Sequence, residues 1–167
     1  MRQNASCELI SATSSSVKTL LKIDGIDIRR GGGEISNTAI GNEALKNANP
    51  SAGGGVSNTA IGQLALCSLT NGARNLAVGS GAMINNTTGS NNTAVGAAAL
   101  CVNTVGGGNV AIGYNTLRNS QTGSNNVAVG INALCSQNTG TTNNGNIAVG
   151  AYSLVNNTLG VGNVAVS

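Results

Sequence analysis

The sequence predicts an all-β protein, built as a parallel β-roll or solenoid of about eight 17-residue repeats behind a small N-terminal β segment. The first observation is a recurring motif, Asn-x-Ala-(Ile/Val)-Gly. It begins at residues 37, 58, 75, 92, 109, 126 and 146, and an eighth copy at residue 163 ends in Ser167. Successive copies start 21, 17, 17, 17, 17, 20 and 17 residues apart. A fixed period of this length is typical of stacked coils, in which each repeat contacts its neighbours.

The second observation is the pattern inside each repeat, with positions counted from the Asn as position 0. A long apolar side chain stands at position +8, directly after a small residue. These apolar residues are Leu45, Leu66, Met83, Leu100, Leu117, Leu134 and Leu154. Six copies have Gly at position +14, and the additional residues of the two longer copies follow it, as in a surface loop. Each repeat is therefore expected to contain a strand, a glycine turn, a short strand around position +8 and a polar turn.

The third observation is a composition that cannot build an ordinary globular core. The 167 residues include 25 Gly but no Phe or Trp, two Tyr and one Pro. Disordered chains lack apolar residues at a strict phase, collagen needs Gly at every third position, and no stretch of about 20 apolar residues suits a membrane span. Nucleic-acid binding would need a basic stripe with aromatic residues, which the repeats lack. We therefore expect no nucleic-acid partner and no membrane insertion.

Charge divides the chain into two parts. Nine of the thirteen charged residues lie within the first 34 residues. We predict a charged anchoring segment at residues 1–33 and a nearly neutral β-roll repeat domain at residues 34–167.

Within the anchoring segment, residues 1–16 are small and polar and suit an extended arm. Asp24-Gly25 between residues 17–23 and 26–28 predicts a β-hairpin, and a simple bend between two strands is the alternative. The two arginines and three glycines at residues 29–33 are expected to form a hinge. The candidate anchoring residues are Leu20, Leu21, Ile23, Ile26, Ile28, Arg29 and Arg30.

The first strand of each repeat carries no charged side chain on either face. Positions 0, +2 and +4 point to one face, and positions +1 and +3 to the other. A wet sheet face would carry polar residues, so one face is expected to line the coil and the other to be covered by a second copy of the chain. The residues assigned to the stacked core or to this interface are the seven at position +8 together with Ile40, Ile61, Val78, Val95, Ile112, Val129, Val149 and Val166. Identical residues are expected to stack as ladders, Asn on Asn included, while the strand at position +8 and the polar turns face outward or cap the edges.

The cysteines and the scarce acidic residues limit the chemistry of the repeats. Cys67, Cys101 and Cys135 occupy position +9 in alternate copies. Two rungs of the coil are about 9.6 Å apart, beyond the roughly 7 Å between Cα atoms that a disulfide spans, so buried free thiols in a reducing cytoplasm are expected. The chain has no His and the repeats have one acidic residue, Glu43. We therefore expect no catalysis, no metal and no cofactor.

These repeats resemble known fibrous proteins. Asn-x-Ala-(Ile/Val)-Gly followed by x-x-Ala-Leu is similar to the head repeats of YadA-like trimeric autotransporter adhesins. The turn at residues 86–92 and the opening at residues 26–33 resemble the shafts of bacteriophage tail fibres and other virion fibres. The resemblance covers about residues 26–167 and implies a left-handed parallel β-roll with three chains around one axis.

The function that the resemblance implies is that of a structural virion protein, a short homotrimeric phage tail fibre assembled in the host cytoplasm. Residues 1–33 would dock on tail, baseplate or capsid proteins, and the rod would mediate host attachment through a surface glycan or protein. The candidate receptor contacts are Arg74, Tyr114, Arg118 and Tyr152.

Three alternatives to a tail fibre follow from the same repeats. The first is a purely structural capsid decoration or fibre spacer. The second is a fragment of a bacterial trimeric adhesin, which is less favoured because the sequence shows no signal peptide, coiled-coil stalk or membrane barrel. The third, an ice-binding solenoid, needs a regular Thr array, whereas position +1 changes from Thr38 and Thr59 to Leu76 and Val110.

Overall fold

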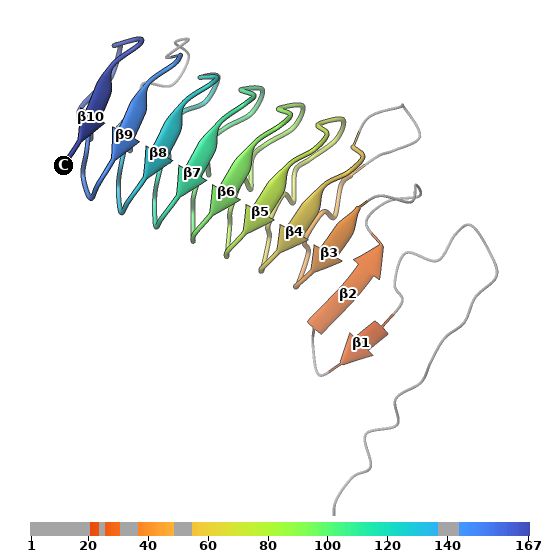
Figure 1. Ribbon diagram of the computed structural model, residues 1–167. Coiled ribbons are helices and arrows are strands. Elements are labelled where there is room, and N and C mark those ends of the chain that lie inside the picture. The colour runs from red at the N-terminus through yellow and green to blue at the C-terminus, as the bar shows by residue number, and fades with distance from the viewer. Residues whose placement is uncertain (1–20, 24–25, 31–36, 49–54, 137–143) are drawn as a thin grey trace, which may run out of the picture.

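A computed structural model describes residues 21–23, 26–30, 37–48, 55–136 and 144–167 of the protein. Its ten strands form one sheet in chain order, and none of the described residues is helical (Figure 1). The strands are β1 (Leu21–Ile23), β2 (Ile26–Arg30), β3 (Thr38–Ile40), β4 (Thr59–Ile61), β5 (Leu76–Val78), β6 (Thr93–Val95), β7 (Val110–Ile112), β8 (Val127–Val129), β9 (Ile147–Val149) and β10 (Val164–Val166). The all-β prediction is confirmed.

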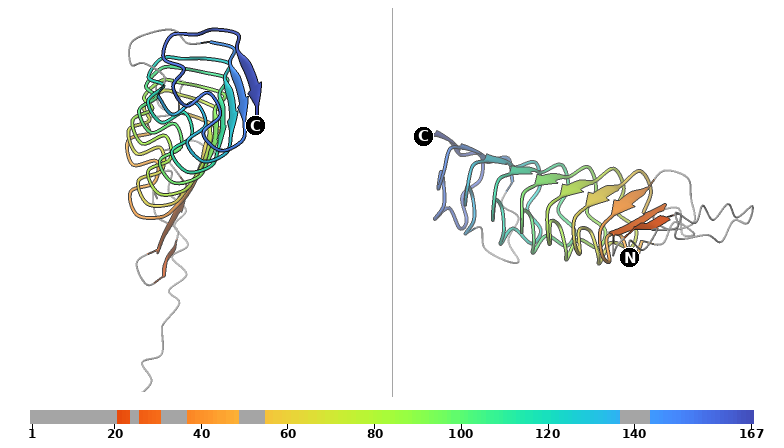
Figure 2. Two further views of the ribbon diagram at one scale, coloured as in Figure 1. Left: turned by 90° about the vertical axis from the view of Figure 1, so that its left-hand side faces the viewer. Right: turned by 90° about the horizontal axis from the view of Figure 1, so that it is seen from below.

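The eight strands β3 to β10 are parallel and form a β-solenoid of about seven turns. Each pairs in register with the next, so that Ala94 of β6 lies beside Ala77 of β5 and Ala111 of β7. Figure 2 shows the turns stacked one behind another, with the strands along one side of the coil. Each predicted copy of the motif therefore supplies one strand. The two longer copies keep the register as well, since Ala39 pairs with Ala60 and Ala128 pairs with Ala148.

The N-terminal strands are antiparallel. Leu21 pairs with Ile28 and Ile23 with Ile26, which confirms the predicted hairpin over a simple bend. The hinge predicted at residues 29–33 is wrong in its first half, because Arg29 and Arg30 belong to β2 and pair with β3. Backbone pairing with the first repeat keeps these two residues extended. Residues 31–33 and Leu20 lie outside the described residues.

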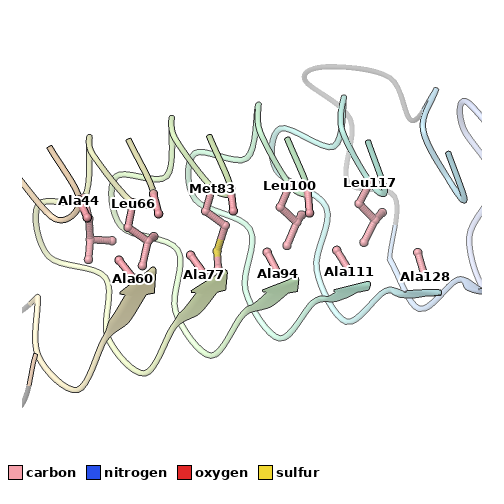
Figure 3. Packing of buried hydrophobic residues seen from close by; sticks show 14 of the residues in the cluster. Ala44, Ala60, Leu66, Ala77, Met83, Ala94, Leu100, Ala111, Leu117 and Ala128 are labelled. Atoms are coloured by element: carbon pink, nitrogen blue, oxygen red, sulfur yellow. The ribbon is translucent and has the colours of Figure 1, made fainter. Parts of the chain in front are cut away.

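The core is a narrow double row of small and long apolar side chains inside the coil. Position +2 contributes Ala from strands β3 to β9, and position +8 contributes Leu or Met from the opposite wall (Figure 3). Leu66, Met83 and Leu100 are completely buried there. Burying one such side chain contributes roughly 1.5–3 kcal/mol relative to exposure. No aromatic residue is needed, because Ala facing Leu fills the short distance between the walls.

The outward orientation expected for the segment around position +8 is wrong. The segment is a turn and not a strand, and its residues adopt left-handed backbone angles, with φ of 51° at Leu66 and at Leu100. Position +6 is left-handed as well, with φ of 60° at Leu64 and 54° at Ala98. The left-handed residues at positions +6 and +8 curl the backbone back over the sheet, and the side chain at position +8 points inward as a result.

Candidate functional site

The outer face of the sheet forms one continuous uncharged surface along the rod. We call it the strand face. It consists of positions +1 and +3 of strands β3 to β10, namely Thr38, Ile40, Thr59, Ile61, Leu76, Val78, Thr93, Val95, Val110, Ile112, Val127, Val129, Ile147, Val149, Val164 and Val166. These side chains point away from the interior and are half-buried or exposed, for example Ile112 at 40% and Leu76 at 37%. The residues predicted at position +3 therefore lie on this surface and not inside the coil.

The strand face has the properties of an association surface. It contains no charged residue, and its only polar side chains are three threonines. Eight rungs at about 4.8 Å make it roughly 34 Å long. Large continuous apolar surfaces are rare on monomeric proteins and mark interaction sites.

A column of buried asparagines at position 0 fixes the spacing of the rungs. The backbone N–H and the Nδ2 of Asn92 both donate to Oδ1 of Asn75, at 3.0 and 3.2 Å. Its own Oδ1 accepts the same two bonds from Asn109, at 2.9 and 3.1 Å. The predicted Asn ladder is thus confirmed. It runs inside the coil, where Asn92 is completely buried, and its oxygens are satisfied by amides.

A second buried column, at position +11, was not anticipated from the sequence. Nδ2 of Asn86 donates to the carbonyl of Gly89 at 3.0 Å, and Nδ2 of Asn103 donates to Asn86 Oδ1 and to the carbonyl of Gly106, both at 3.1 Å. The glycine at position +14 thereby receives amides from both columns, since Asn92 Nδ2 also donates to Gly106 at 2.9 Å. The available signal was an Asn at position +11 in only some of the copies.

The cysteines differ in burial from the prediction. Cys67, Cys101 and Cys135 are free, as expected, but they are half-buried and not buried. Position +9 directly follows the inward Leu, so its side chain turns toward the outer surface of the coil. The arginine at the same position in an intervening turn, Arg118, is exposed.

Two of the four candidate contact residues lie on one edge of the rod. Tyr114 is 54% exposed at position +5, and Tyr152 is 60% exposed at position +6. Ile131, 50% exposed, comes from the turn between them. Backbone bonds join the three turns, because Tyr152 N–H donates to Ile131 at 2.8 Å and Asn132 N–H donates to Tyr114 at 3.0 Å. We call Tyr114, Ile131 and Tyr152 the tyrosine ridge, and it contains both aromatic residues of the protein.

The two candidate arginines do not join this ridge as one cluster. Arg74 directly precedes Asn75, which is followed by strand β5, whereas the tyrosines come after strands β7 and β9. Arg74 therefore lies near the beginning of its strand and in an earlier turn, and the tyrosines lie near the ends of theirs. Arg74 is exposed, with a left-handed φ of 58° where later copies have Asn91, Gly108 and Asn125. Arg118 follows Tyr114 by four residues in the same turn. The structure therefore offers one aromatic edge and a separate cation before β5.

Within the described residues, no three His, Cys, Asp or Glu side chains are grouped to hold a metal ion. The described ranges also contain no helix with the length and hydropathy needed to cross a membrane. Comparison with protein-family models, curated proteins and solved structures found no match to the chain.

Proposed function

We propose that the protein is a structural fibre subunit, three copies of which associate through the strand face around one axis. The observation that carries the proposal is the strand face itself, which presents sixteen uncharged positions over eight rungs without a covering element among the described residues. Association of three rods would bury these Val, Ile and Leu side chains at the centre. The repeat resemblance supports three copies over two and a left-handed coil.

The proposed assembly is a short phage tail fibre that forms part of the virion. Residues 1–33 dock on tail, baseplate or capsid proteins, through the anchoring residues predicted from the sequence. Pairing of β2 with β3 supports this role, because backbone hydrogen bonds connect that segment to the first turn of the rod. A force or a rotation applied to the anchoring segment would then reach the solenoid directly, because Arg29 and Arg30 are paired with β3 and do not form a flexible joint.

The tyrosine ridge is the proposed contact with the host surface, and the partner is a glycan or a protein there. Tyrosine supplies a large, rigid contact area and is enriched among the residues that dominate binding energy. The ridge lies on the edge of the coil and not on the strand face, so trimer formation would leave it accessible.

The first test measures native mass. The full chain and residues 34–167 are expected to form trimers, for the full chain about 49 kDa from the 16.3 kDa subunit. Val95→Asp is expected to abolish the trimer, because three carboxylates would meet in an apolar interface and desolvation of an unpaired charge is very costly. Ala97→Asp, in the same turn but exposed off the strand face, should remain trimeric. A monomeric wild type, or a trimeric Val95→Asp variant of unchanged thermal stability, contradicts the proposed assembly.

The second test measures host adsorption. Virions carrying Tyr114→Ser are expected to adsorb about tenfold more slowly, a loss equivalent to roughly 1.4 kcal/mol of binding. Val105→Ser is the matched control, since Val105 is also 54% exposed but lies in the polar turn. If Tyr114→Ser virions with intact fibres adsorb normally, the tyrosine ridge is not the contact with the host surface. Normal adsorption by virions that lack the protein would favour a spacer or decoration.

A further inference from the structure

Two completely enclosed polar atoms in the second Asn column have no hydrogen-bond partner among the residues that the structure describes. They are Oδ1 of Asn103 and Oγ of Ser120, whose residues are 0% and 1% exposed. They belong to consecutive turns at the same position, +11. A buried polar group without a partner is costly, and an ordered water is a frequent explanation.

The preceding turn shows which group of the second Asn column normally occupies this position, namely a side-chain amide nitrogen. Nδ2 of Asn103 sits between two acceptors, Oδ1 of Asn86 and the carbonyl of Gly106, at 3.1 Å from each. One turn further on, the equivalent acceptors are Asn103 Oδ1 and the carbonyl of Gly123. Both lie within 2.5 Å of the point where a Cβ on Gly106 would stand, so they face the same small volume. At Gly89 the equivalent point has the Asn103 amide nitrogen at 3.0 Å, whereas at Gly106 no amide nitrogen of the described residues is among the three nearest atoms, because residue 120 is Ser.

The backbone does not collapse around the shorter side chain. Ser120 N–H donates to the Leu117 carbonyl at 3.2 Å, as Asn103 N–H does to the Leu100 carbonyl at 3.2 Å. Replacing an Asn carboxamide by a hydroxyl, with the backbone unchanged, leaves a free volume similar to that of one water molecule, roughly 30 Å³. The space is bordered by three oxygens and is polar.

The Gly123 carbonyl has acceptor capacity for a further donor. Gly89 and Gly106 each accept two side-chain amides, one from each Asn column. Gly123 accepts the position 0 amide, from Asn109 Nδ2 at 2.8 Å. Ser120 has no amide to supply the second bond that position +11 gives to Gly89 and Gly106. Because a carbonyl oxygen has two lone pairs, the Gly123 carbonyl can accept one more hydrogen bond.

We propose that one internal water molecule is bound at this point of every subunit, between Asn103, Ser120 and Gly123. It donates its two hydrogens to Asn103 Oδ1 and the Gly123 carbonyl, and it accepts the Ser120 hydroxyl hydrogen. Three such bonds are the usual number for a buried water. A monovalent cation is disfavoured, because it would lose its hydration shell in a cage without a negative charge.

The test compares the wild-type protein with Ser120→Asn, in which the new Nδ2 takes the place of the water. A high-resolution crystal structure of the wild type is expected to show one solvent peak within about 2.7–3.2 Å of the three oxygens. The variant should lack this peak, and oxygen-17 relaxation should count one fewer long-lived water per chain. Its unfolding equilibrium constant should fall about tenfold, as expected for a buried hydrogen bond gained. Ser80→Asn, at an exposed position of the rod, is the control and should change neither quantity.

Three outcomes would overturn the proposal. One is a wild-type structure in which Ser120 Oγ bonds directly to Asn103 Oδ1 with no peak between them. Another is a peak with the anomalous signal or the short, five- to six-fold contacts of a metal cation. The third is an unchanged water count in a folded Ser120→Asn variant.

Discussion

Gly96→Ala is expected to destabilise the protein by more than about 4 kcal/mol, a loss that is exceptional for a single methyl group. Gly96 has a φ of 138°, and a Cβ there would stand 2.6 Å from the Gly113 carbonyl carbon of the next turn and closer still to its oxygen. The contacted atoms are backbone and cannot rotate away. Gly96 N–H donates to Val78 and Gly113 N–H donates to Val95, both at 2.8 Å, and these bonds hold the turns at their spacing. Chemical denaturation of the wild-type protein and the variant measures the effect.

The matched control for Gly96→Ala is Gly81→Ala in the preceding turn. Gly81 also has a left-handed φ, of 66°, but a Cβ there would meet no atom within 4 Å. The control isolates the backbone strain, roughly 1–2 kcal/mol for a non-Gly residue in this region. Equal losses for the two variants would show that the turns are not stacked as closely at Gly96 as described.

Asn92→Leu is expected to cost at least about 4 kcal/mol, although the two side chains have similar size. The substitution removes the acceptor of Asn109 N–H and Nδ2, and it removes the donor to Asn75 Oδ1 and the Gly106 carbonyl. All four bonds lie in the closed interior, where each hydrogen bond contributes roughly 0.5–1.5 kcal/mol. Asn109 N–H is also left without an acceptor, which costs roughly 1–3 kcal/mol. Thermal unfolding of the purified wild-type and variant proteins gives the measurement.

Asn85→Leu serves as the control for Asn92→Leu. Asn85 is exposed, and its side chain makes one bond, to the Cys101 carbonyl at 3.0 Å. Water can replace that bond, so the loss should stay below about 1 kcal/mol. If Asn92→Leu proves no more destabilising than this control, the column does not contribute to holding the turns together.

The parts of the fold that the sequence predicted are those with an extended backbone. Alternation correctly placed Ala94 and Val95 on opposite faces of the strand, because successive residues of a strand point to opposite sides. Which of the two faces lines the interior was left open, and the structure shows that it is the face of Ala94. In-register pairing followed from the period. The apolar strand face was predicted as well, as an uncharged surface in need of a cover.

The parts that could not be predicted lie where the backbone leaves the extended region. The alternation of inward and outward side chains fails at Leu100, because left-handed backbone angles at Ala98 and Leu100 rotate the chain. Such angles cannot be predicted from the sequence here, since Leu rarely adopts them. The half-buried thiol of Cys101 follows from the same rotation. The second Asn column could not be predicted, because position +11 is not the same residue in all copies. It is Leu69 in one turn and Ser120 in another.

The asparagine columns give the rod an electrical direction. Backbone bonds between turns alternate in sense, as with Thr93 donating forward to Asn109 and Gly96 donating back to Val78, so their dipoles largely cancel. The side-chain amides do not alternate. Every side-chain bond between two asparagines of the position 0 column, from Asn58 to Asn163, runs from the Nδ2 on one turn to the Oδ1 of the turn before. Aligned amides polarise one another, so a rod almost without charged side chains is a cumulative dipole, with its positive end toward β3 and its negative end toward β10.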